Sequence, residues 1–181
     1  ITEDDIRKAI KVNNEARLAL RKLYGVMKHD PAPITGYDLF KVLYGSTFKL
    51  DRSLIAGEVN ALVEKIEKEY KEGKMQPKKP RILVTGCPLG GATEKVIRAI
   101  EDNGGIVVTY ENCTGAKAID KMVDEDDPDV YGALARRYLD IGCSVMTPNP
   151  NRLDLLDRLI DEFKVDGVVE MTLQALSLIH I

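Results

Sequence analysis

The sequence predicts an α/β protein in which a helical connector leads into a truncated Rossmann-like domain with a parallel sheet. Residues 1–73 place their apolar side chains at helical spacing throughout. Residues 81–175 instead alternate short β-branched runs with amphipathic stretches, which is the pattern of strand–helix–strand units. Between the two regions lies a basic segment with two prolines, residues 74–80, which is typical of a linker.

Three helices are expected before the linker, at residues 2–28, 35–44 and 51–73. Acidic residues after Thr2 suit the positive end of the first helix dipole. The two prolines of His29–Pro33 end that helix, because proline cannot continue it. Asp51 is expected to cap the third helix and Gly73 to close it. These helices are too amphipathic to stand alone, so we expect them to pack against something larger.

After the linker, strands are expected at 81–86, 106–110 and 165–172, and helices at 93–103, 118–123, 129–139 and 151–163. Thr93 is the expected N-cap of the first of these helices, and Gly104 begins its C-terminal cap. Right-handed crossovers would make the strands parallel. The carboxyl ends of all three strands would then share one edge of the sheet, where such folds bind ligands.

The composition of the chain excludes several classes of partner. With 44% hydrophobic residues, 30% charged residues and a formal net charge of −3, the 181-residue chain is a globular, mildly acidic protein. It lacks the basic excess that nucleic acid or anionic lipid requires, and its apolar runs are far shorter than a bilayer span. Three widely spaced cysteines argue against a disulfide scaffold. We therefore expect a cytoplasmic protein that binds neither nucleic acid nor membrane.

The end of the chain has an unusual pattern. Leu176–Ile181 is an apolar hexapeptide just past a predicted strand, and read-through into a common transposon-based sequencing adapter would encode it. We expect residues 176–181 to be a non-native tail. Three strands are few for a sheet of this kind, so we expect 81–175 to be a partial domain and the chain to be an internal fragment.

Three cysteines carry the sharpest functional signal. Cys87 follows the first predicted strand, Cys113 lies just past the second, and Cys143 lies in the loop before the last helix and strand. They are 26 and 30 residues apart, about one strand–helix unit each, so their thiols converge if the loops share one edge. Soft thiolates on converging loops suit an iron–sulfur cluster or zinc. A glycine near each cysteine would let the backbone approach a bulky group: Gly86, Gly115 and Gly142.

Other interpretations of the same residues stay open. The cysteines are also typical of buried free thiols. Residues 85–93 are compatible with a phosphate cradle at a helix start, although they match neither the P-loop nor the dinucleotide fingerprint. The chain would then be a cluster-free nucleotide- or CoA-binding module, or a structural subunit whose partner holds the active site. Glu111, Lys117 and Glu170 lie at the same expected edge, either as proton carriers or as paired or solvated loop charges.

Four segments occur in the order in which one family carries them: Val-Thr-Gly-Cys-Pro at 84–88, Glu-Asn-Cys-Thr-Gly-Ala-Lys at 111–117, Cys-Ser-Val-Met-Thr-Pro-Asn at 143–149, and Asp-Gly-Val-Val-Glu-Met-Thr-Leu-Gln-Ala at 166–175. Through them the chain resembles the 2-hydroxyacyl-CoA dehydratase family, also called the 2-hydroxyglutaryl-CoA dehydratase D-component family. The resemblance covers residues 1–175 and is greatest to the double-cubane cluster branch.

The resemblance implies Rossmann-like domains that hold an iron–sulfur cluster of the [4Fe–4S] or double-cubane type. It implies a dehydratase or reductase component that receives single electrons from an ATP-hydrolysing activator protein and passes them to a small or CoA-thioester substrate. It also implies a homodimer, or a heterodimer with a related subunit. Carried over residue by residue, Cys87, Cys113 and Cys143 match cluster ligands. The sequence departs from the family after Ala175, where a cysteine is expected and Leu176 stands instead.

Overall fold

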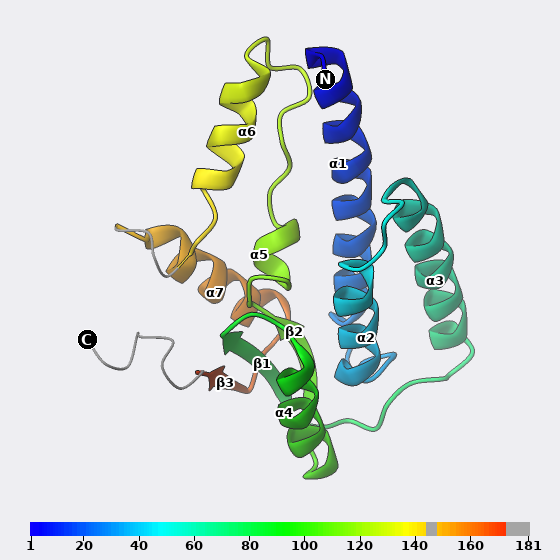
Figure 1. Cartoon of the computed structure of the whole chain (residues 1–181). Coiled ribbons are helices and arrows are strands. Elements are labelled where there is room, and N and C mark those ends of the chain that lie inside the picture. Colours follow the sequence, from blue (N-terminus) through cyan, green and yellow to red (C-terminus); the bar gives the residue numbers. More distant parts are fainter. Residues whose placement is uncertain (144–147, 173–181) are drawn as a thin grey trace.

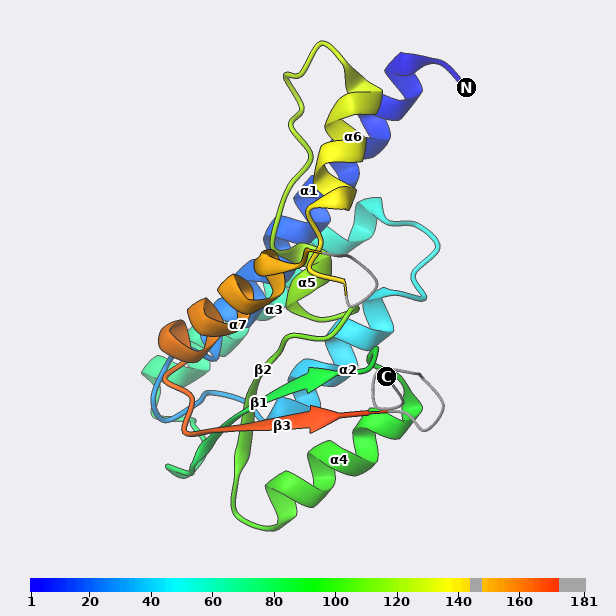
Figure 2. The same cartoon turned by 90° about the vertical axis from the view of Figure 1, so that its left-hand side faces the viewer.

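The centre of the molecule is a parallel sheet with the strand order β2–β1–β3 in the computed structural model, which describes residues 1–143 and 148–172. The strands are β1 (Arg81–Gly86), β2 (Ile106–Tyr110) and β3 (Gly167–Met171). Val84 pairs with Tyr110 on one side and Val169 on the other. The sheet lies between α4 (Gly91–Asp102) and α7 (Pro150–Glu162) (Figure 2). The prediction of an α/β fold with parallel strands is confirmed.

Three helices precede the sheet: α1 (Glu3–Val26), α2 (Gly36–Ser46) and α3 (Ser53–Lys71). A capping box starts α1, because the amide of Asp5 donates to the Thr2 hydroxyl (3.2 Å) and the Thr2 amide donates to the Asp5 carboxylate (2.8 Å). Helix α3 lies alongside α1 (Figure 1). Among the described residues, no helix combines the length and the apolar character that crossing a bilayer requires.

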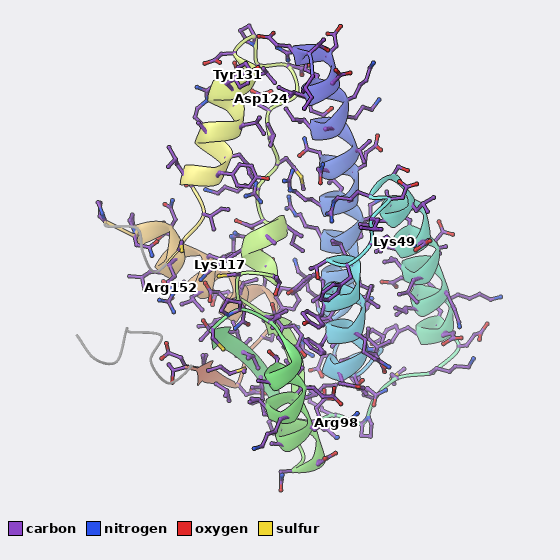
Figure 3. The ribbon with its side chains drawn as sticks, viewed as in Figure 1. Lys49, Arg98, Lys117, Asp124, Tyr131 and Arg152 are labelled. Atoms are coloured by element: carbon purple, nitrogen blue, oxygen red, sulfur yellow. The ribbon has the colours of Figure 1, made fainter. Side chains whose placement is uncertain are left out.

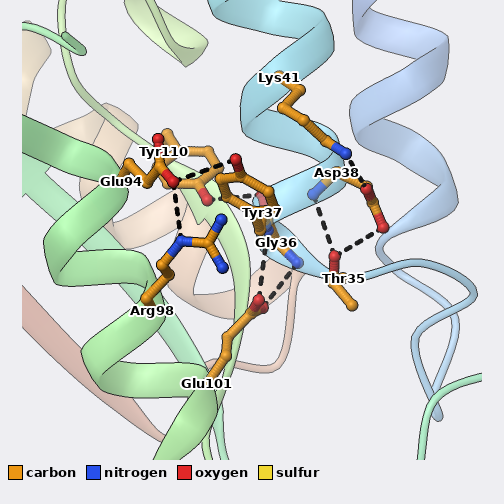
Figure 4. Close-up of polar contacts among 9 residues, drawn as sticks. All are labelled: Thr35, Gly36, Tyr37, Asp38, Lys41, Glu94, Arg98, Glu101 and Tyr110. Carbon is orange, nitrogen blue, oxygen red and sulfur yellow. Dashed lines mark hydrogen bonds and ion pairs between the residues drawn. The ribbon is translucent and has the colours of Figure 1, made fainter. Parts of the chain in front are cut away.

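The start of α2 is fixed to α4 and β2 (Figure 4). The carboxylate of Glu101 accepts hydrogen bonds from the amides of Gly36 (2.7 Å) and Tyr37 (3.3 Å), so a negative charge meets the positive end of the α2 dipole. The Tyr110 hydroxyl donates to the Gly36 carbonyl (2.7 Å). A side chain at position 36 would collide with the Val107 carbonyl, which explains the glycine there.

One hydrophobic core joins the helical residues to the sheet, and fully buried side chains from both regions meet in it: Leu23, Met27, Leu39, Ile55, Leu83, Val84 and Val107. The buried Arg81 guanidinium adds a polar tie, because it donates to the carbonyls of Met27 (2.6 Å), His29 (3.0 Å) and Phe163 (2.7 Å). The helices thus pack against the α/β region, as their amphipathic pattern requires. The division into 1–73, 74–80 and 81–175 stays a prediction, and the expected tail at 176–181 lies outside the described residues.

A second, smaller core lies where the start of α1 meets α6 (Val130–Leu139), and it consists of Ile10, Val123, Val130 and Ala133. The two helices lie side by side at the end of the molecule away from the sheet (Figure 1). Buried Asn14 of α1 binds the backbone of Val123 twice, through its amide nitrogen (2.8 Å) and its carbonyl oxygen (3.1 Å). Arg7 donates to three carbonyls of the loop before α6, at residues 125, 127 and 128.

Several element boundaries differ from the expected ones. Gly90, not Thr93, is the N-cap of α4; the Thr93 hydroxyl lies one turn inside and accepts from the Gly90 amide (3.0 Å). Asp51 binds the Ser53 amide (3.0 Å), but the cap position itself is Arg52. The short helix expected at 118–123 is α5 (Ala116–Ile119). It begins and ends earlier than expected, and Lys117 in its first turn pairs with a buried carboxylate.

Candidate functional site

Cys87 and Cys113 lie at the same edge of the sheet, where β1 and β2 end. Cys87 follows β1 directly, and its amide donates to the Met171 carbonyl at the end of β3 (2.8 Å). Cys113 lies three residues past β2 and is exposed, whereas Cys87 is half-buried. The expected convergence of these two loops therefore follows from strand order, because β1 and β2 are neighbours.

Hydrogen bonds tie the two loops together. The side-chain amide of Asn112 donates to the Cys87 carbonyl (2.5 Å), and the Leu89 amide donates to the Thr114 hydroxyl (3.1 Å). Burial raises the pKa of the Cys87 thiol, and the negative charge of an ionised Cys113 raises it further. The hydrogen bonds between the loops place the two cysteines at the same edge of the sheet. The structure thus brings two of the three predicted ligands together.

Cys143 is half-buried and is held by its backbone. Its amide donates to the Ile141 carbonyl (2.6 Å), and its carbonyl accepts from the side chain of Asn149, the residue that precedes α7 (2.6 Å). Residues 144–147 lie outside the described residues. Within 1–143 and 148–172, no three His, Cys, Asp or Glu side chains are grouped closely enough to hold one metal ion. Convergence of Cys143 with the other two thiols stays a prediction.

The glycines near the cysteines have a structural explanation. Gly86 has φ +101°, and a side chain there would collide with the Met171 carbonyl. A side chain at Gly115 would collide with the Tyr110 carbonyl, and one at Gly142 would come within 2.8 Å of Arg152 Cα. Close packing within the protein accounts for these glycines, and the approach of a bulky group at the same positions stays a prediction.

Glu111 and Lys117 form a buried ion pair beside Cys113. Their oxygen and nitrogen are 2.8 Å apart, and the side chains are 0% and 3% exposed. The Thr85 hydroxyl of β1 donates to the other carboxylate oxygen (2.5 Å). Lys117 lies where α5 meets the ends of the strands (Figure 3). Of the alternatives raised from the sequence, the paired charge is therefore correct for these two residues. Glu170 of β3 is exposed at 59% and lies 3.8 Å from Arg152.

Cys113 also lines a cavity of about 380 Å³ that was not predicted from the sequence. Three arginines also line it: Arg17 of α1, Arg52 before α3 and Arg137 of α6. Each comes from an amphipathic helical stretch, where a charged residue is ordinarily a solvated one. The only available signal was that Arg17 and Arg137 lie on the apolar sides of their helices, and this pattern points to no ligand by itself.

The thiols at this edge fit an iron–sulfur group in chemistry. Two cysteines lie on hydrogen-bonded loops, and one of them is exposed, so a soft metal centre could reach both sulfurs. Each cysteine of a cubane binds a different iron, which places ligand sulfurs further apart than those around a single ion. The absence of a single-ion group among the described residues is consistent with that chemistry.

A family model described as "2-hydroxyglutaryl-CoA dehydratase, D-component" matches residues 1–175. The chain is similar to a protein named "Putative dehydratase subunit YjiM" from Escherichia coli (strain K12), with 49% identity over 175 residues, which are 97% of this chain and 45% of that protein. It is also similar to a benzoyl-CoA reductase subunit from Thauera aromatica, with 24% identity over 176 residues, covering 92% of this chain and 40% of that protein.

The chain thus spans less than half the length of these two curated relatives. The match nevertheless extends from the first helix to the end of the last strand, through both cysteine loops at the sheet edge. This agrees with the resemblance carried by the four sequence segments. The chain belongs to the 2-hydroxyglutaryl-CoA dehydratase D-component family.

Proposed function

We propose that this chain is part of an iron–sulfur protein that acts as a dehydratase or reductase component and passes single electrons to a small or CoA-thioester substrate. The observation that carries the proposal is the placement of Cys87 and Cys113 on hydrogen-bonded loops where β1 and β2 end. Family membership and the similarity to a benzoyl-CoA reductase subunit support the same class of reaction. The proposal concerns the protein of which this chain is a part.

Cys87, Cys113 and Cys143 are the ligands that this chain would contribute. A bound cluster, of the [4Fe–4S] or double-cubane type, would supply one-electron chemistry at low potential. An ATP-hydrolysing activator protein would be the electron donor. We place the protein in the cytoplasm, as a homodimer or as a heterodimer with a related subunit.

Other residues of the chain would keep the thiols in position. Asn112 is fully buried and holds the Cys87 carbonyl, which fixes the first loop against the second. The pair of Glu111 and Lys117 fixes the start of the second loop, because both charges are buried and each needs the other. Ligands held in this way require little ordering when a metal group binds.

The test is the iron content of the full-length protein after purification without oxygen. We expect iron, acid-labile sulfide and broad visible absorbance. Cys87→Ser and Cys113→Ser should each lower the iron content severalfold, because serine is a poor ligand for this metal group. Met75→Ser is the matched control, since it removes an exposed sulfur from the linker. Unchanged iron content in both cysteine variants would contradict the proposal.

One observation favours a second candidate, a cluster-free nucleotide- or CoA-binding module. Cys87 is half-buried and its pKa is raised by that burial, which is the state of an ordinary core thiol. In this alternative the full-length protein would contain no iron after anaerobic purification. It would instead bind a nucleotide or CoA, with an affinity that Cys87→Ser and Cys113→Ser leave unchanged.

A further inference from the structure

The cavity beside Cys113 carries an uncompensated positive charge. Its volume is about 380 Å³, and α1, α2, α5 and α6 contribute to its walls. The residues that line it include Arg17, Arg52 and Arg137 but neither an aspartate nor a glutamate. The other lining residues are uncharged, and they include polar side chains such as Asn13 and Thr47 and apolar ones such as Leu20 and Leu43.

Each of the three guanidinium groups is bonded to neutral partners. Arg17 donates to the Asn14 side chain (2.9 Å) and to the Tyr138 hydroxyl (3.3 Å), and Arg52 donates to the Asn13 side chain (2.8 Å). Within 1–143 and 148–172, none of the three arginines forms a salt bridge. These bonds orient the guanidinium groups without neutralising them.

Arg137 is 5% exposed and donates to the carbonyls of Ala118 (2.6 Å) and Lys121 (3.1 Å). Burial lowers the pKa of its guanidinium, and the positive charge of Arg17 lowers it further, so the two groups lie close enough to repel one another.

Asp120 and Asp140 act electrostatically on Arg137, but neither lines the cavity and each is paired with another cation. Asp120 accepts from Arg158 (2.6 Å), and Asp140 pairs with Lys121. No carboxylate lines the cavity, so the repulsion between Arg17 and Arg137 is not offset there. An anion in the cavity would relieve it.

We propose that this cavity binds the carboxylate or phosphate group of a small organic anion, with Arg17 and Arg52 as its donors. Both are half-buried, so their charge acts through less water than on an open surface. A guanidinium group matches carboxylate and phosphate oxygens in pairs, and the apolar lining residues would contact the rest of the ligand. Because Cys113 lines the cavity, the ligand would lie beside the metal group. This placement rests on the proposed function.

The test is calorimetric titration of the full-length protein, purified without oxygen, with inorganic phosphate, succinate and succinamide. We expect saturable binding of at least one anion, weaker at high salt, and none of the neutral succinamide. Binding of phosphate alone or of succinate alone tells which anionic group the site takes. Failure of both anions to bind would overturn the proposal.

Variants locate the binding. Arg17→Gln and Arg52→Gln should each weaken it about tenfold, the usual effect of one charge-assisted hydrogen bond. Arg17→Lys keeps the charge but not the paired donors, so it should fall between wild type and Arg17→Gln. Arg136→Gln is the matched control, because it removes the same charge from α6 outside the cavity. Equal affinities in all four variants would also overturn the proposal.

Iron content measured on the same samples separates the two proposals. Protein that contains iron but binds neither anion rejects the cavity as a ligand site and leaves the iron–sulfur function standing. Protein that binds an anion through Arg17 and Arg52 but contains no iron rejects the iron–sulfur function and leaves the cavity standing. If Arg17→Gln lost both its iron and its anion binding, and its urea midpoint also fell, this variant would be misfolded. The affinity of Arg52→Gln for the anion would then test the cavity.

Discussion

Two groups of charged side chains flank Cys113, and only one of them is neutralised by an opposite charge. On the side of the sheet, Glu111 and Lys117 are completely buried and paired at 2.8 Å. On the side of the cavity, Arg17 and Arg52 are half-buried and carry only neutral partners. The loop that contains Cys113 therefore lies between a matched pair and an unmatched positive cluster.

This difference distinguishes charged side chains that stabilise the fold from charged side chains that bind a ligand. A buried ion pair seldom adds much stability, but each partner is costly to leave alone, so the pair fixes the backbone around it. A cluster of like charges that faces a cavity contributes nothing comparable to the fold. Stability measurements should therefore respond strongly to one side of Cys113 and weakly to the other.

The largest effect is expected from Lys117→Met. The change leaves the Glu111 carboxylate buried without its cation, which should lower the free energy of unfolding by about 3–5 kcal/mol. Urea unfolding followed by circular dichroism measures it. In the double variant Glu111→Gln/Lys117→Met no buried charge remains, and most of the loss should be recovered. Exposed ion pairs contribute below about 1 kcal/mol. If Lys117→Met lost no more unfolding free energy than that, the buried ion pair would matter no more to stability than the cavity arginines do.

A smaller loss is expected from Arg137→Met, which tests the boundary between the two groups. Its guanidinium lines the cavity and also holds the carbonyls of Ala118 and Lys121. Leaving these carbonyls unpaired should cost about 1–3 kcal/mol, partly offset because a desolvated charge disappears. The same urea titration applies. A loss as large as that of Lys117→Met would place Arg137 with the structural charges.

The exposed ion pair of Lys28 and Glu162 serves as a reference for the buried pair, and its contribution to stability depends on pH. The hydrogen bond from Lys28 (2.7 Å) is the main cause that lowers the pKa of Glu162 below its ordinary value of 4.5. A lowered folded-state pKa stabilises the protein above the unfolded-state pKa, and this contribution disappears as the pH falls through the folded-state pKa.

Lys28→Met should therefore lose less stability than wild type between pH 5 and pH 3, by under about 1 kcal/mol because the pair is exposed. Thermal unfolding at each pH measures the difference. Parallel curves for the two proteins would contradict it.

The smallest effect on stability is expected from Arg52→Gln, within about 0.5 kcal/mol of wild type, because its guanidinium serves no buried carbonyl. Added phosphate or succinate should raise the melting temperature of wild type more than that of Arg52→Gln, since a ligand stabilises the state that binds it. Equal shifts in the two proteins would mean that Arg52 does not contact the anion.

Much of the fold was predictable because it depends on local patterns. Proline and glycine positions set the limits of the first three helices, and the β-branched runs set β1 and β2. The sequence predicted β3 from residue 165, but the Val165 amide closes α7 by donating to the Ile160 carbonyl (3.0 Å). Errors of this kind occur at the ends of elements, where the last turn of a helix and the start of a strand compete for the same residues.

The site was predictable only in part, for a different reason. Strand order brings the loops of Cys87 and Cys113 together, and the alternating pattern of the sequence predicted parallel strands that end at one shared edge. The burial of Glu111 and the meeting of Arg17 with Arg137 depend on how three helices pack. Arg17 and Arg137 are 120 residues apart in the chain. No spacing rule links such positions, so the cavity became visible only in three dimensions.

The two hydrogen bonds between Asn14 and Val123 have a consequence for amide exchange. Val123 lies in a segment without regular secondary structure, where backbone amides ordinarily exchange quickly with solvent deuterium. Its amide instead donates to a buried side chain of α1. The amide can exchange only when the segment detaches from α1, so its protection factor reports the opening of that contact. A single peptide probe around residue 123 would thus follow the docking of α6 on α1 in real time.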